Sequence, residues 1–241
     1  MGINRDLSKY IGSFFAPWRK RERNNYSKYS NNDRTIYKKL IKDINQKGYK
    51  ISYLNEISFI DKNDLSVVPI IEKYLPLFEN KGIQNYLFKC LGFKGNILSV
   101  DFLIKEFKKP NDNWDRNDTF NWNFTRRKIV SDALYIICDA SKEKEYIELI
   151  EEKDTHDDCY FIILTLGKIR SENAIPTLIK VLRDDNLDLQ YATIEALGYY
   201  KKHPELINYL TPFLNASYKP HKEIAEKSIK KLKSKYKGIK H

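Results

Sequence analysis

Apolar residues recur at helical spacing along most of this 241-residue chain. One stripe, in the segment 174–182, is formed by Ile175, Leu178, Ile179 and Leu182. Comparable stripes occupy the segments 67–75, 99–107, 145–150 and 206–214. Residues three and four positions apart share one face of a helix, and an apolar face must be buried against another element. The pattern therefore predicts an all-α protein built from packed helices.

A second helical segment follows each stripe and carries a small residue directly before a large aliphatic one. The five pairs are Cys90-Leu91, Ala133-Leu134, Thr165-Leu166, Ala196-Leu197 and Ser228-Ile229. They recur after 43, 32, 31 and 32 residues, a spacing typical of two-helix repeats. A lone hairpin cannot bury its stripe, whereas stacked hairpins share a continuous core. We therefore predict a right-handed α-solenoid of about five helical hairpins, in which the small residues let adjacent helices approach closely.

The repeat also predicts the domain organisation. The solenoid is expected to span residues 64–237. Residues 1–63 are expected to form an N-terminal helical cap with a basic segment, and residues 238–241 the end of a basic tail.

Two helix starts are marked by a polar residue three positions before a proline. These are Ser66 before Pro69, and Asn173 before Pro176. Serine and asparagine are favourable N-cap residues, and proline is tolerated in the first turn because N–H groups there have no partner within the helix. Ser66 and Asn173 are therefore predicted to be N-caps.

The segment LGKIRSENAIPTLIKVLRDDNLDLQYATIEALGYYKKHPELINYLTPFL (166–214) resembles HEAT repeats, particularly the bacterial kind labelled phycobilisome-lyase-like. The resemblance implies an α-solenoid and no particular activity. Extended solenoids offer large surfaces and rarely carry their own reaction chemistry, which favours recognition of another macromolecule. The resemblance implies no lyase chemistry, because the repeated residues are those that pack the core. HEAT repeats often carry an arginine near the start of the second helix. Arg127 matches it, but Cys159 and Gln190 stand at the equivalent places, so a regular Asp–Arg ladder is not expected.

The spacings are interrupted once, by about eleven residues, between the two helices of the second repeat. The inserted stretch and the start of the following helix read NDNWDRNDTFNWNFTRRK, residues 111–128. Tryptophan and arginine are frequent anchors of protein-binding sites. The predicted partner-binding residues are Trp114, Asp115, Trp122, Arg126 and Arg127. In the alternative interpretation, Trp122 and Phe124 fold back over the repeat core.

The N-terminal segment is amphipathic. Its apolar face is formed by Leu7, Tyr10, Ile11, Phe14, Phe15 and Trp18, and a basic patch of Arg19, Lys20, Arg21 and Arg23 follows. One interpretation is a helix that covers the exposed end of the first repeat, with the basic patch in solvent. The alternative is a segment that docks in a partner groove or on an anionic membrane surface.

The net charge of +11 is concentrated at the two ends of the chain. Residues 1–50 hold 13 basic and 4 acidic side chains, and residues 216–241 hold 9 and 2. Nucleic-acid binding through these ends is therefore an alternative function, including a DNA-glycosylase-like one that uses the Trp/Asp/Arg cluster. A protein that follows a duplex needs basic residues along one face. The arginines at 126 and 127 are instead followed in the next repeats by Asp157, Asp158 and Asp188.

Signals for reaction chemistry are weak. The histidines His156, His203, His221 and His241 lack metal-ligand spacing, and the chain has neither a CxxC motif nor a glycine-rich phosphate loop. We therefore expect no metal, cofactor or small-molecule substrate. The three cysteines and the lack of a long apolar run are typical of a reduced, cytoplasmic protein. The function predicted is non-catalytic recognition of a protein partner, with membrane binding not expected.

Overall fold

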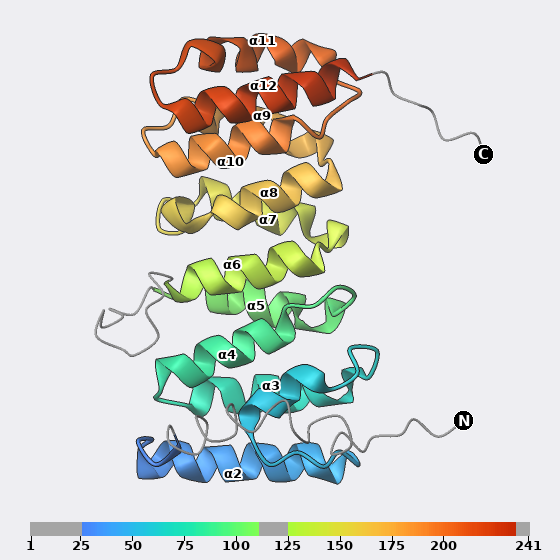
Figure 1. Ribbon diagram of the computed structural model, residues 1–241, viewed down its shortest axis with the longest axis vertical. Coiled ribbons are helices and arrows are strands. Elements are labelled where there is room, and N and C mark those ends of the chain that lie inside the picture. The colour runs from blue at the N-terminus through green and yellow to red at the C-terminus, as the bar shows by residue number, and fades with distance from the viewer. Residues whose placement is uncertain (1–25, 111–124, 235–241) are drawn as a thin grey trace, which may run out of the picture. The chain divides into compact units, whose positions relative to one another are not determined.

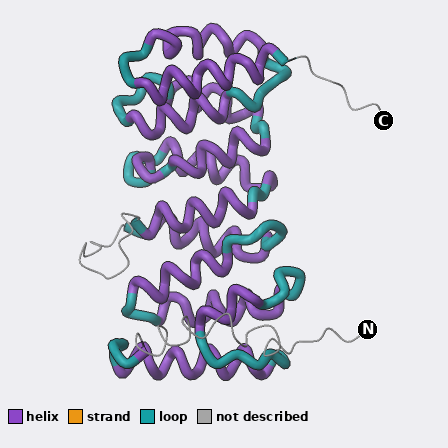
Figure 2. The backbone as a smooth tube through the Cα atoms, viewed as in Figure 1, coloured by secondary structure: helices purple, strands orange, loops and turns teal. Residues whose placement is uncertain are grey.

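The computed structural model describes residues 26–110 and 125–234. Within these ranges every regular element is a helix, as Figure 2 shows. The predicted all-α class is therefore confirmed. No helix in the described ranges is both long and apolar enough to cross a membrane.

The chain divides into two compact units. The described part of unit 1 is residues 26–102, and that of unit 2 is residues 103–110 and 125–234. The boundary falls inside helix α5 (Val100–Lys108). The boundaries predicted from sequence at residues 63 and 237 stay predictions.

Unit 1 contains one long helix followed by short helical segments. Its elements are α2 (Asn31–Gln46), η2 (Leu54–Phe59), η3 (Leu65–Val67), α3 (Val68–Tyr74), η4 (Leu75–Leu77), α4 (Lys81–Leu91) and η5 (Ile97–Ser99), where η marks a 3-10 helix. Helix α2 starts after Ser30, whose hydroxyl accepts a bond from Asp33 N at 3.0 Å. The core lies where α2 packs on α3, with Leu40, Ile44 and Ile71 almost fully buried.

The turns of unit 1 are held by polar side chains that bond to the backbone. The Tyr37 hydroxyl accepts a bond from Leu54 N at 3.1 Å. The Asn45 amide bonds to both the N–H and the carbonyl of Ile51, each at 2.9 Å. Glu56 accepts from the N–H of Ser52 at 2.6 Å. Because buried backbone groups need partners, these bonds fix the path of the chain after α2.

Unit 2 is a stack of helical pairs, the α-solenoid predicted from the repeat. Its main helices after α5 are α6 (Arg126–Ile137), α7 (Glu143–Glu151), α8 (Tyr160–Ile169), α9 (Ile175–Val181), α10 (Leu187–Leu197), α11 (Ile207–Leu210) and α12 (Lys219–Lys233). The short 3-10 segments between them are η6 (Ala140–Lys142), η7 (His156–Asp158), η8 (Glu172–Ala174), η9 (Pro204–Leu206) and η10 (Thr211–Asn215). The second helices form one layer, since α8 packs on α6 and α10, and α10 packs on α12 (Figure 1).

Glycines bring these second helices into close contact. A Cβ atom at Gly167 would lie 2.6 Å from the Cα atom of Ala196, and one at Gly198 would lie 2.7 Å from the Cβ atom of Ser228. Real Cβ atoms do not approach other atoms so closely. Ala196 and Ser228 are the small residues of two repeat pairs, and the structure confirms that adjacent helices are in close contact at both.

The helix starts differ from the prediction in one detail. Pro69 and Pro176 do lie in the first turns of α3 and α9. Ser66 and Asn173, however, are not the capping residues. A 3-10 turn precedes each helix, so the caps lie two residues earlier, at Asp64 and Ser171. The Asp64 carboxylate accepts from Ser66 N at 3.0 Å, and the Ser171 hydroxyl accepts from Ala174 N at 3.1 Å.

Candidate functional site

Four tyrosines and one glutamate meet on the layer of second helices in unit 2. Tyr135 comes from α6, Tyr160 from α8, Tyr191 and Glu195 from α10, and Tyr199 from the turn after α10. All five side chains are partly exposed. The Tyr199 hydroxyl donates to Glu195 Oε1 at 3.3 Å. Burial first, and the Glu195 carboxylate second, raise the pKa of all four tyrosines. These five residues are named the tyrosine–carboxylate face.

The helix stack explains why the five side chains converge. Tyr191, Glu195 and Tyr199 follow one another at intervals of four residues, so they point to one side of α10 and its end. The ring of Phe161 connects the neighbouring helices, since its centroid lies 5.9 Å from that of Tyr135 and 5.1 Å from that of Tyr160. Helix α8 packs closely on α10 at Gly167 and also packs on α6, so the tyrosines of all three helices lie on the same layer as Glu195.

The face is electrostatically negative. Burial is the main cause that raises the pKa of its tyrosines, to about 12 for Tyr160, so the phenols stay neutral hydrogen-bond donors at physiological pH. Carboxylates beside the face add to the shift: Asp132 acts on Tyr135, Asp188 on Tyr160 and Glu223 on Tyr191.

Two lysines already cover part of the aromatic surface. Lys168 Nζ lies 4.3 Å from the ring centroid of Tyr135 and donates to the Tyr135 carbonyl at 3.1 Å. Lys231 Nζ lies 4.4 Å from the ring centroid of Tyr199. Both contacts show that rings on this face attract cations. Within residues 125–234, no lysine or arginine is placed over the rings of Tyr160 and Tyr191.

The predicted binding residues Arg126 and Arg127 start helix α6, as expected, but their side chains lie in the interior. Arg127 is 2% exposed, and its Nε donates to the carbonyls of Phe107 at 2.8 Å and Lys109 at 3.1 Å. Its other nitrogens bond to the carbonyl and the carboxylate of Asp154. Arg126 is 7% exposed and donates to the Pro110 carbonyl. Both arginines therefore join α6 to the chain that follows α5, and partner binding by them stays a prediction.

The residues at the positions equivalent to Arg127 also donate hydrogen bonds to backbone carbonyls, but through an amide and a thiol instead of a guanidinium group. Gln190 donates to the carbonyls of Leu182 and Asp184, at 3.3 and 2.5 Å. The Cys159 thiol donates to the carbonyl of Leu149 at 3.2 Å, and burial raises the pKa of that thiol, so it keeps its proton. An Asp–Arg contact between repeats forms at Arg127, whose Nη1 lies 3.6 Å from Asp158. In these three repeats the residue at this position thus bonds to a carbonyl at or near the end of the first helix.

The remaining predicted residues lie outside the described part of the chain. They are Trp114, Asp115 and Trp122 of the insertion, and Arg19, Lys20, Arg21 and Arg23 of the N-terminal basic patch. Their predicted roles stay predictions.

Residues 145–230 match the family model for HEAT repeats. The matched range contains most of α7 to α12 and four of the five residues of the tyrosine–carboxylate face, all but Tyr135. HEAT repeats generally act as protein-interaction scaffolds. No curated protein matches the chain.

The groups on the tyrosine–carboxylate face are suited to binding. In residues 26–110 and 125–234, no group of three or more histidine, cysteine, aspartate or glutamate side chains is arranged to hold a metal ion. The face offers neutral hydroxyl groups, aromatic rings and a carboxylate. Such groups recognise a cationic, hydrogen-bonding ligand.

The tyrosine–carboxylate face was not predicted from the sequence, although a signal for it exists. Tyr160 and Tyr191 each stand six residues before the aliphatic residue of their repeat, Leu166 and Leu197. A repeated aromatic residue at a position that does not face the core indicates a surface feature shared by neighbouring repeats.

Proposed function

We propose that the chain is a non-catalytic recognition module that binds a protein partner through the tyrosine–carboxylate face. The observation that carries this proposal is the group of four partly exposed tyrosines on neighbouring helices, tied together by the Tyr199–Glu195 hydrogen bond and by the ring contacts of Phe161 with Tyr135 and Tyr160. Tyrosine supplies a large contact area at low cost in side-chain entropy, and it is enriched in binding hot spots. The HEAT-repeat match supports the same class of function.

The chemistry of the face favours a basic segment with arginine. A guanidinium group can bond to the Glu195 carboxylate through two parallel N–H groups while its plane stacks on a tyrosine ring. After burial, the Glu195 carboxylate is the next cause that raises the pKa of Tyr160 and Tyr191, and Asp188 and Glu223 add to the negative potential at these rings. Lysine offers only a point charge, so it should bind more weakly.

The same acids disfavour a phosphate backbone on this face. Nucleic acid would have to bind through the basic ends, whose key residues Arg19, Lys20, Arg21 and Arg23 lie outside the described range. Such binding weakens steeply as salt rises, whereas a packed aromatic contact weakens much less. Salt dependence therefore separates the two functions.

Binding of defined peptides tests the proposal. A fluorescent peptide with two arginines is compared by anisotropy with peptides in which lysine or uncharged citrulline replaces arginine. We expect arginine to bind best and citrulline worst. Glu195→Gln should weaken the arginine peptide about tenfold, which corresponds to ~1.4 kcal/mol.

The matched control is Glu226→Gln, which removes the same charge from an exposed position on α12. Equal affinity in the two variants would contradict the proposed site. A contribution of the insertion is a separate hypothesis, tested with Trp114→Ala and Trp122→Ala in the same assay. If captured partners from native extract disappear after nuclease treatment, the protein-binding function itself is overturned.

A further inference from the structure

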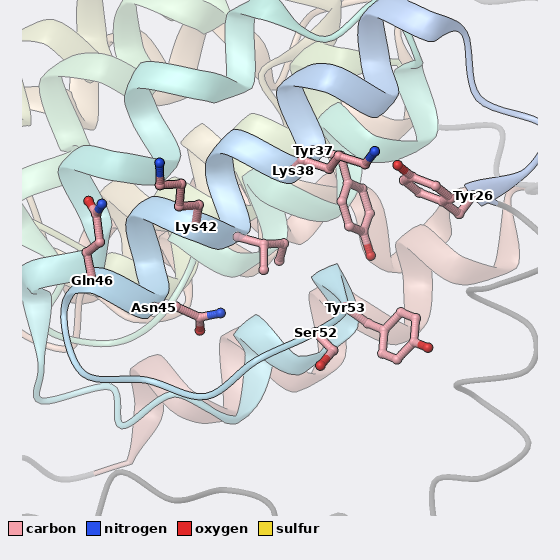
Figure 3. A pocket seen from close by; sticks show the side chains of 9 residues that line it. Tyr26, Tyr37, Lys38, Lys42, Asn45, Gln46, Ser52 and Tyr53 are labelled. Carbon is pink, nitrogen blue, oxygen red and sulfur yellow. The ribbon is translucent and has the colours of Figure 1, made fainter.

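A groove of about 790 Å³ lies in unit 1 along the outer side of α2. Figure 3 shows Tyr26 and Tyr37 at one end, Asn45 and Gln46 at the other, and Tyr53 across from the helix. The rings of Tyr26 and Tyr37 meet edge to face, with centroids 5.0 Å apart. This groove belongs to unit 1 and is distinct from the tyrosine–carboxylate face.

The groove offers apolar surface more than hydrogen bonds. The hydroxyl of Tyr37 and the amide of Asn45 already bond to the backbone at Leu54 and Ile51. Ile41, which also lines the groove, remains partly exposed. The charged residues Lys38 and Lys42 are exposed and need not be displaced by an occupant. The fitting occupant is therefore an uncharged segment with large apolar side chains.

The chain itself carries such a segment shortly before Tyr26 in the sequence. Residues 10–18, YIGSFFAPW, contain no charged side chain and include four aromatic residues and one isoleucine. Eight residues lead from Trp18 to Tyr26, which lines the groove, and an extended chain of that length spans up to about 28 Å. The α2 residues that line the groove, from Tyr37 to Gln46, extend over only ~14 Å.

We propose that residues 10–18 occupy this groove in the same molecule, with Phe14, Phe15 or Trp18 against Ile41. A short covalent tether gives an effective local concentration in the millimolar range, which favours this occupant over a segment from another molecule. The inference is independent of the function proposed for unit 2.

Tryptophan fluorescence of the full chain tests the proposal. In a Trp114→Phe, Trp122→Phe background, Trp18 is the remaining tryptophan. We expect a blue-shifted emission and weak quenching by acrylamide. Ile41→Asp should shift the emission to the red and raise the quenching constant about threefold. The control Ile97→Asp changes an isoleucine of unit 1 that is 62% exposed and lies outside the groove, and it should leave both values unchanged.

A second variant keeps the test valid if Ile41→Asp does not fold, because it changes the segment and not the groove. Phe14→Ser with Phe15→Ser leaves the groove intact, and it should also raise the quenching of Trp18. The proposal is overturned if Trp18 is quenched as strongly as free tryptophan in every variant, or equally in Ile41→Asp and Ile97→Asp. Protection that grows with protein concentration would also overturn it, because the occupant would then come from a second copy.

Discussion

Units 1 and 2 are both helical, and polar side chains bond to the backbone at the turns of each, but in unit 2 glycines add close contacts between helices. In unit 2, glycine lets the backbones of neighbouring helices meet, as at Gly167 and Ala196. In unit 1, polar side chains fix the turns, as at Tyr37 and Glu56. A repeated backbone contact needs the same small residues in every repeat, whereas a turn fixed by side chains needs residues particular to that turn. The family match covers part of unit 2, where the repeated contacts lie.

One position of the repeat is polar in both units, and substitutions there should give the largest difference in stability between the units. Arg127 in unit 2 and Gln84 in unit 1 both stand seven residues before the aliphatic residue of their repeat, Leu134 and Leu91. Gln84 Nε2 donates to one acceptor, the Phe78 carbonyl, at 2.5 Å. Arg127 donates to the carbonyls of Phe107 and Asp154 and to the Asp154 carboxylate.

Replacing each residue by methionine keeps most of the apolar volume and removes these donors. We expect Arg127→Met to lower the free energy of unfolding by about 3 kcal/mol, and Gln84→Met by about 1 kcal/mol. Urea unfolding followed by circular dichroism measures both values. Equal losses would show that the additional bonds of Arg127 contribute nothing to stability.

Much of unit 2 could be predicted from the sequence, because its helices and close contacts repeat at a fixed spacing. The burial of Arg127 could not, since its acceptors at Phe107 and Asp154 lie 20 and 27 residues away. In unit 1, the bond from Glu79 N to Asp33 joins residues 46 positions apart, and no periodic pattern indicates it. Convergence on Glu195 likewise depends on how closely three helices pack, which residue spacing alone does not determine.

Two glycines make a second comparison, because they are required for different reasons. Gly167 is needed for space, since a Cβ atom there would lie 2.6 Å from the backbone of Ala196. Gly95 in unit 1 has nothing within 4 Å but adopts a φ of +92°. We expect Gly167→Ala to cost about 2 kcal/mol through overpacking, and Gly95→Ala about 1 kcal/mol through backbone strain.

Thermal unfolding of the two variants checks these values, and a paired substitution separates the two causes. Ala196→Gly removes one of the atoms that crowd Gly167, so it should recover part of the loss in Gly167→Ala and none of the loss in Gly95→Ala. Recovery in both variants would mean that the effect is not local to the contact between α8 and α10.

The smallest expected difference concerns pH. In unit 2, His156 Nδ1 bonds to the Ile150 carbonyl at 2.6 Å, and its Nε2 bonds to Asp184 at 2.8 Å. Burial alone would lower the pKa of His156, but these two bonds raise it above its ordinary value of 6.5. In unit 1, Asp43 accepts from Tyr74 at 2.7 Å and from Lys73 at 3.2 Å, and these bonds lower the pKa of Asp43. The bonds of Lys73 to Tyr74, at 3.3 Å, and to Asp43 raise the pKa of Lys73.

A histidine whose pKa is higher in the folded state stabilises the protein fully below its unfolded pKa, near 6.5, and the effect is lost as pH rises through the folded pKa. The contact of η7 with the end of α9 should therefore weaken by roughly 0.5 kcal/mol above neutrality, because the pair is partly exposed. The Asp43 contact should not change between about pH 5 and 9, since its groups titrate outside that window. Both pH responses are measured by the hydrogen exchange of backbone amides, at α9 for the His156 contact and at α2 for the Asp43 contact. The exchange rates are corrected for the intrinsic pH dependence of amide exchange. His156→Gln should remove the pH dependence at α9 and leave α2 unaffected; a response that persists in this variant would assign the effect to another group.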